Sequence, residues 1–256
     1  MKILWLSDLH VTAPGAPAPA GVDPNRRLRS ALDHAVARHA DADLLVITGD
    51  LVQGRSASAY PVLRGVLADL TIPVRLLLGN HDDRDAFFDA FPDAPRTDGY
   101  AQFMEKIGGY RVVYLDTLAA DGKHHGELCA RRLEWLERVL ADGDEPTLIF
   151  MHHPPFDVGV PGLDALKLVD GDRFASVLQP AAVRQIFCGH LHRSVGGSWS
   201  GIPVSVIKSP HVGFALEMTE RKLVRSDDAP GYGVVLADRE GVVVHLEELT
   251  SPIERG

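Results

Sequence analysis

The chain has 256 residues, of which 45% are hydrophobic, and it carries a formal net charge of −9. This length and composition predict a globular protein with a sizeable core. The acidic residues are scattered, which argues against nucleic-acid polymers or anionic membranes as partners, since both attract clustered Lys and Arg. No apolar stretch approaches the roughly 20 residues of a membrane span. The apolar run after Lys2 is short and is interrupted by Asp8, so we expect a cytoplasmic protein without a signal peptide.

Short apolar runs alternate with amphipathic segments along the first three quarters of the chain. We predict strands at Ile3–Leu6, Leu44–Ile47, Leu76–Leu78, Arg111–Leu115, Leu148–Met151 and Ile186–Cys188. We predict helices at Arg29–His39, Tyr60–Leu70, Asp85–Phe91, Glu127–Leu140 and Phe174–Leu178. The segment Thr12–Asn25 is rich in Pro, Gly and Ala and is predicted to be a loop.

The final quarter lacks long helices. Its predicted strands are Val204–Ile207, Phe214–Met218, Tyr232–Ala237 and Val242–Leu246, and their short connections predict antiparallel pairing. We therefore expect an α/β fold of two packed mixed β-sheets flanked by helices, in one domain that spans residues 1–256. The antiparallel strands from about residue 202 onward are expected to belong to the second sheet.

Five of the predicted strands are followed by side chains that can bind a metal ion. These side chains are Asp8, His10, Asp50, Asn80, His81, His152, His190 and His192. Ligands of open α/β sheets bind beyond the carboxyl ends of the strands, so residues far apart in sequence can converge there. Each residue taken alone fits a turn or a solvated histidine, but the five coincidences together favour a metal site. Asp116 also follows a strand but has no neighbouring ligand, and we interpret it as structural.

These motifs resemble a known family. Asp8-x-His10, Gly49-Asp50, Gly79-Asn80-His81-Asp82, His152 and Gly189-His190-Leu191-His192 resemble, in this order, the five blocks of the calcineurin-like metallophosphoesterases. Finer features resemble the bacterial class III cyclic-nucleotide phosphodiesterases and related glycerophosphodiesterases. They are Gly79–Arg84, Gly126–Leu128 before Leu133–Leu136, His152–Pro155 and Gly189–Arg193. The resemblance implies a four-layer αββα sandwich that carries a two-metal centre.

The resemblance also implies a division of the ligands. Asp8, His10 and His192 would hold one ion, Asn80, His152 and His190 the other, and Asp50 would bridge the two. Nitrogen and oxygen ligands without thiolate suit Mn, Fe, Zn or Co. The expected reaction is hydrolysis of a small phosphodiester, above all a 3',5'-cyclic nucleotide of the cAMP type, by attack of a metal-bound hydroxide on phosphorus.

His81 is the predicted catalytic residue, which would donate a hydrogen bond to the phosphate or protonate the leaving oxygen. Asn80, His81 and His211 are the candidate substrate-binding residues. Asp82 or Asp83 would either orient His81 or cap a turn.

Several alternatives stay open. The same centre would serve a broader phosphoesterase that acts on glycerophosphodiesters or monoesters, and a non-catalytic metal-binding scaffold is disfavoured because all the motifs are intact. His153 either supports a ligand or faces solvent, and Arg84 and Arg193 either contact phosphate or lie on the surface. His124 and His125 are interpreted as solvated. The apolar C-terminal strands would pair within the chain or between subunits of a homo-oligomer.

Overall fold

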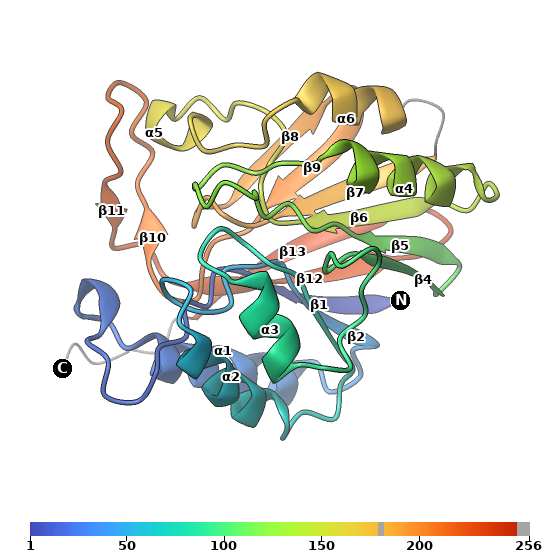
Figure 1. The fold of residues 1–256 in the computed structure, drawn as a ribbon. Coiled ribbons are helices and arrows are strands. Elements are labelled where there is room, and N and C mark those ends of the chain that lie inside the picture. Colours follow the sequence, from blue (N-terminus) through green and yellow to red (C-terminus); the bar gives the residue numbers. More distant parts are fainter. Residues whose placement is uncertain (179–181, 250–256) are drawn as a thin grey trace.

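The computed structural model describes residues 1–178 and 182–249. Two β-sheets pack face to face, and helices cover their outer faces (Figure 1). The first sheet has the order β13 (Val242–Glu248), β12 (Gly231–Ala237), β1 (Lys2–Leu6), β2 (Leu44–Ile47) and β3 (Val74–Leu76). The second has the order β4 (Phe103–Ile107), β5 (Tyr110–Tyr114), β6 (Thr147–Met151), β7 (Val183–Cys188), β9 (Ile202–Val206) and β8 (Val195–Trp199). The predicted two-sheet sandwich is confirmed. The predicted domain of residues 1–256 includes 179–181 and 250–256, which lie outside the described residues.

The space between the sheets is filled by one apolar cluster to which both sheets contribute. Trp5 of β1 packs edge-on against Phe187 of β7, with ring centroids 5.2 Å apart, and its indole nitrogen donates to Thr48 Oγ1 at 3.0 Å. Every residue of β2, β5 and β6 is buried. Strands covered on both faces read as continuous apolar runs instead of alternating ones, which is why these strands were predictable.

Helices form the two outer layers. The helices α1 (Pro24–Arg38), α2 (Tyr60–Leu67) and α3 (Arg84–Ala90) pack on the first sheet, and α4 (Ala130–Ala141) and α6 (Gly171–Leu178) pack on the second. A short helix, α5 (Pro161–Asp164), lies at the edge of the second helical layer, and its Leu163 belongs to the same apolar cluster as residues of α4 and α6 (Figure 1). Helix α1 begins earlier than predicted because Asp23 caps it, accepting from the backbone N–H groups of Asn25 and Arg26.

The C-terminal strands differ from prediction in two respects. They divide between the sheets: β9 joins the second sheet parallel to β7, whereas β12 joins the first sheet antiparallel to β1. The predicted strand Phe214–Met218 is wrong. Only Gly213–Phe214 (β10) is extended, and it pairs with Arg225–Ser226 (β11) in a small hairpin.

Other boundaries shift less. Strand β3 ends at Leu76 instead of Leu78, and β4 and β8 were not predicted. Strand β8 contains Gly196 and Gly197 and is partly exposed, so it lacks an apolar pattern. Within the described residues, no helix combines the length and apolar character needed to cross a membrane.

Candidate metal centre

The predicted metal ligands lie at the carboxyl ends of β1, β2, β3, β6 and β7, and the fold brings them into two adjoining groups. One group consists of Asp8, His10, Asp50 and His192. The other consists of His152, His153 and His190. In each group the candidate ligand atoms lie within 4.8 Å of one another, and every member is buried. Asn80 adjoins the second group, since its Oδ1 lies 3.3 Å from His152 Nε2.

The backbone at these positions is strained. Asp8, His10, Asp50, His190 and His192 all have positive φ, between 48° and 72°. For a residue with a side chain this region costs roughly 1–3 kcal/mol, and it persists where surrounding structure enforces it. Five of the seven predicted ligands share this conformation, which turns each strand end sharply and aims the side chain at the centre.

Two glycines allow the strand ends to approach closely. A Cβ atom built on Gly79 would overlap the carboxylate of Asp50 and would lie 2.6 Å from His152 Nε2. A Cβ atom on Gly189 would overlap the hydroxyl of Ser7 and would lie 2.9 Å from Asp8 Oδ2. Both positions therefore require glycine for steric reasons.

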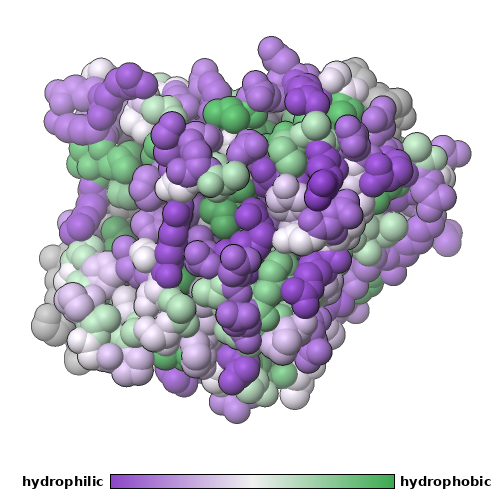
Figure 2. Space-filling view, viewed as in Figure 1, coloured by the Kyte–Doolittle hydropathy of each residue, from purple (hydrophilic) through white to green (hydrophobic). Residues whose placement is uncertain are grey.

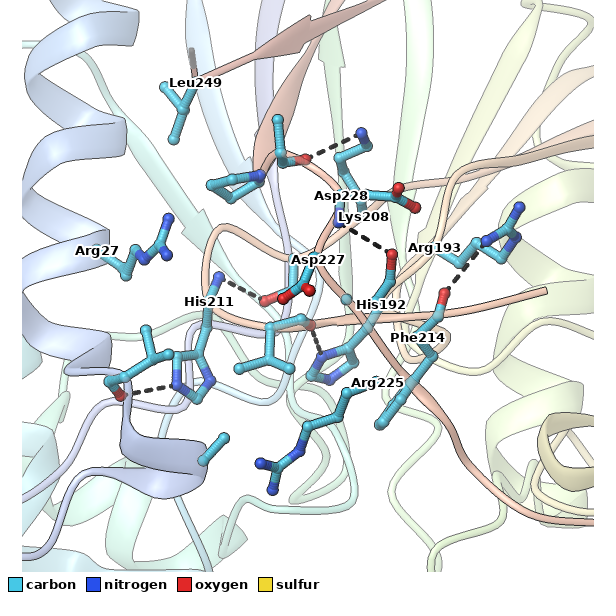
Figure 3. Close-up of a pocket in the computed structure, with 18 of the residues that line it drawn as sticks. Arg27, His192, Arg193, Lys208, His211, Phe214, Arg225, Asp227, Asp228 and Leu249 are labelled. Atoms are coloured by element: carbon cyan, nitrogen blue, oxygen red, sulfur yellow. Dashed lines mark hydrogen bonds between the residues drawn. The ribbon is translucent and has the colours of Figure 1, made fainter. Parts of the chain in front are cut away.

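Backbone carbonyls determine which nitrogen of two imidazoles faces the centre. His152 Nδ1 donates to Thr48 O at 2.7 Å, and His192 Nδ1 donates to Val212 O at 2.6 Å (Figure 3). A carbonyl can only accept, so in the neutral ring the proton is on Nδ1 and the lone pair is on Nε2. Outer hydrogen bonds of this kind are typical of histidines that bind metals.

Asp50 lies between the two groups. Its Oδ1 is 3.5 Å from His152 Nε2, and its Oδ2 is 3.7 Å from His10 Nε2. The backbone N–H of His81 donates to Oδ1 at 2.7 Å and helps to hold the carboxylate in place. One carboxylate with an oxygen directed at each group is the geometry that a ligand shared by two cations requires.

The charges of the centre fit bound cations. Burial disfavours the charged form of Asp8, but the neighbouring imidazole of His192 outweighs this effect and lowers the pKa of Asp8 to about 2. Burial likewise opposes the imidazolium form of His152, yet Asp50 raises its pKa to about 9. His190 Nε2 is buried without a hydrogen-bond partner. Two buried carboxylates and several inward lone pairs need positive charge among them, so the residues present fit metal ions.

His124 is a neighbour of the centre that sequence reasoning placed in solvent. Its side chain is exposed, but its Nδ1 accepts a hydrogen bond from Asn80 Nδ2 at 2.8 Å. This bond directs Asn80 Oδ1 toward His152. The loop that carries His124 is anchored by Arg55, which donates to Gly122 O at 2.8 Å. A histidine in a polar loop has no local signal that would reveal this contact.

His81 lies above the ligands in a cavity of about 380 Å³. Its ring centroid is 4.8 Å from that of His10 and 5.3 Å from that of His124. Asp82 accepts from the backbone N–H groups of Gly79 and two other residues, and Asp83 caps α3 through Ala86 N. The two aspartates thus hold the backbone of this turn, as the capping interpretation predicts.

Contacts in the structure bear on three further candidates. His153 is fully buried beside His190, so the solvent-facing alternative is wrong. Arg84 donates to both carboxylate oxygens of Asp116, at 2.8 and 2.9 Å, which makes this pair structural and removes Arg84 from the site. His211 donates from Nε2 to Val22 O at 3.0 Å (Figure 3), so this nitrogen is occupied within the protein.

Comparison with known proteins agrees with this fold. Residues 1–194 match the family model of the calcineurin-like phosphoesterases. The chain is 37% identical to a probable cyclic nucleotide phosphodiesterase of Rhodopseudomonas palustris, over 96% of this chain and 91% of that protein. It is 33% identical to the 3',5'-cyclic adenosine monophosphate phosphodiesterase CpdA of Escherichia coli, over 78% of this chain and 73% of that protein. A dimetal phosphatase of Danio rerio has a similar fold, with a TM-score of 0.74 at 15% identity over 97% of this chain and 96% of that one.

The chain belongs to the calcineurin-like phosphoesterase family. Proteins of this family use a binuclear metal centre, and this chain has the Asp and His groups that can bind one. The sequence-based prediction of a metal-dependent hydrolase that cleaves phosphodiesters is confirmed.

Proposed function

We propose that this enzyme hydrolyses 3',5'-cyclic nucleotides, cyclic AMP in particular, at a centre of two metal ions. The observation that carries the two-metal proposal is the position of Asp50, which directs one oxygen at each ligand group. The similarity to cyclic nucleotide phosphodiesterases supports the choice of cyclic nucleotides as substrates.

The proposed ligands of one ion are Asp8, His10 and His192, and those of the other are Asn80, His152 and His190, with Asp50 shared. His153 adjoins the second set, with its Nδ1 2.8 Å from Thr117 Oγ1. The described ligands include no thiolate, so we propose Mn, Fe, Zn or Co as the metals. When bound, two such ions neutralise charge on the phosphoryl group and make hydroxide available at neutral pH.

The residues of the chain have separate tasks in this proposal. His81 donates a hydrogen bond to the phosphate or a proton to the leaving oxygen. Asn80 presents its amide oxygen to the centre because His124 occupies its amide nitrogen. The positive-φ strand ends keep the ligands in place before substrate arrives, so little reorganisation accompanies the reaction.

We further propose that residues 1–256 act as one catalytic domain, because the two sheets share one apolar cluster between them. A cytoplasmic location and a homo-oligomeric state stay predictions.

A panel of substrates tests the function. Metal-loaded enzyme is assayed on cyclic AMP, sn-glycero-3-phosphoethanolamine, bis(p-nitrophenyl) phosphate and p-nitrophenyl phosphate. We expect kcat/KM to be highest for cyclic AMP and lowest for the monoester. Faster turnover of the monoester than of every diester would refute the proposal, and preference for the glycerol diester would replace cyclic nucleotides with glycerophosphodiesters.

A further inference from the structure

The cavity above the metal ligands has two chemically different sides. One set of lining residues is polar and includes His10, Asp50 and Asn80. The other set forms an apolar wall and consists of Leu163 of α5 and Leu166 just after it, together with Phe214 and Leu223 from the β10–β11 hairpin. A phosphoryl group fits the polar set, whereas the apolar wall offers no hydrogen-bond donor or positive charge to a phosphate.

The wall is assembled from two segments that are far apart in sequence. The hairpin rises beside α5 at one edge of the molecule (Figure 1). A Cβ atom built on Gly162 of α5 would lie 3.2 Å from Lys222 O and 3.3 Å from Leu223 Cδ2, so the two segments are in contact. Apolar side chains are visible at this edge (Figure 2), and Leu223 is 46% exposed. The wall is thus held in place while part of its apolar surface is left uncovered.

The positively charged side chain of Arg225 lies at the border of this wall. Arg225 of β11 lines both the cavity above the ligands and a neighbouring cavity of about 780 Å³. The side chain of Arg225 is exposed at this border. Its side chain extends past His192 and His211, away from Lys208 (Figure 3). A guanidinium in this position can stack on a flat ring or donate to polar atoms at the edge of the ring.

We infer that the β10–β11 hairpin and α5 form a base-binding wall, which contacts the nucleobase of the substrate while the phosphate lies on the metal side. A nucleobase has apolar faces and a polar edge, which match the leucines and Arg225, respectively. The glycerol group of a glycerophosphodiester has no flat apolar face and would leave the wall uncovered. This inference rests on the proposed function and names the residues that select the substrate.

The test measures binding as well as turnover. Calorimetry compares adenosine 5'-monophosphate with ribose 5-phosphate on manganese-loaded protein, because ribose 5-phosphate keeps the sugar and phosphate and carries a hydroxyl group in place of the base. Wild-type protein should bind the nucleotide at least about tenfold more tightly, the effect of burying part of an apolar side chain or ring face. Leu223→Asn and Arg225→Ala should each reduce this ratio several-fold and raise KM for cyclic AMP. The affinity for ribose 5-phosphate should not change.

Matched controls lie on the same hairpin. Leu216→Asn and Arg221→Ala change exposed residues that do not line the cavity, and the ratio should stay at the wild-type value. Gly162→Ala tests the wall by a second route, because the added methyl group would press on the hairpin without contacting a metal ligand. It should lower nucleotide affinity and leave the affinity for ribose 5-phosphate unchanged.

Two failures can be told apart. Equal affinity for the two ligands, or an equal loss for both in Leu223→Asn, would overturn the base-binding wall even if cyclic AMP is hydrolysed. If the base increases affinity but no diester is hydrolysed by metal-loaded protein, the wall stands and the proposed function fails.

Discussion

The Nε2 atoms of His10 and His192 lie only 3.0 Å apart. His192 donates from Nδ1 to a backbone carbonyl, and His10 Nδ1 lies 2.8 Å from Gln53 Oε1. With a proton on each Nδ1, both Nε2 atoms direct lone pairs at each other. Two lone pairs at this distance repel, and a cation or a proton must relieve the repulsion. The arrangement of these two imidazoles therefore favours binding of a positive charge between them.

Removal of metal should abolish phosphodiesterase activity and lower stability. Protein treated with a chelator should lose turnover, and added manganese should restore it with two equivalents bound per chain by elemental analysis. Metal that binds only the native state stabilises it by about 2.7 kcal/mol at a concentration 100 times Kd. Thermal unfolding of metal-free and metal-loaded protein measures this difference. One equivalent at saturation, with full activity, would contradict the shared role of Asp50.

His81→Ala should lower kcat while both metals stay bound. A positioned acid or hydrogen-bond donor contributes typically about 10²–10⁴-fold to a rate. The loss should be smaller for bis(p-nitrophenyl) phosphate, whose leaving group needs no proton, if His81 acts on the leaving oxygen. Elemental analysis serves as the control for metal content. An unchanged kcat for both cyclic AMP and bis(p-nitrophenyl) phosphate would exclude His81 from the reaction.

His124→Ala should weaken metal binding although His124 is not a proposed ligand. Without its Nδ1 acceptor, Asn80 loses the hydrogen bond that directs its amide oxygen toward His152. Loss of such a supporting contact costs about 10–100-fold in metal affinity or activity. His125→Ala is the matched control, since His125 is the adjacent residue and lies 3.8 Å from Asp121 instead. Titration with manganese measures both variants, and equal affinities would argue against the role of His124.

Two glycine substitutions should change stability in opposite directions. Gly79→Ala places a methyl group on the carboxylate of Asp50 and should destabilise the protein by about 1–3 kcal/mol and impair metal binding. Gly65→Ala lies within α2, where a Cβ atom meets no other atom within 4 Å, and should stabilise the protein by about 0.5–1 kcal/mol. Chemical denaturation of metal-free protein measures both changes. A loss of stability in the Gly65→Ala variant would show that the added methyl group clashes with a neighbouring atom.

The elements that the sequence predicted well are those buried on both faces or amphipathic over several turns. Strand β2 coincides with its prediction because all its residues are apolar and bounded by turn residues. The predicted strand at Phe214–Met218 failed for a related reason. Its apolar residues belong to a hairpin at the wall of the cavity, where Leu216 and Met218 are exposed, and an apolar run looks the same in either setting.

The sequence by itself predicted the candidate metal ligands, because each follows a strand within four residues and the chemistry of carboxylate, amide and imidazole is local. Only the tertiary structure decided which partners support and surround them. His124 reaches Asn80, and Leu223 approaches Gly162 of α5, through loops whose paths depend on packing between distant segments. Side chains of this kind have no spacing or periodicity in the chain, so their roles become visible only once the two sheets are packed together.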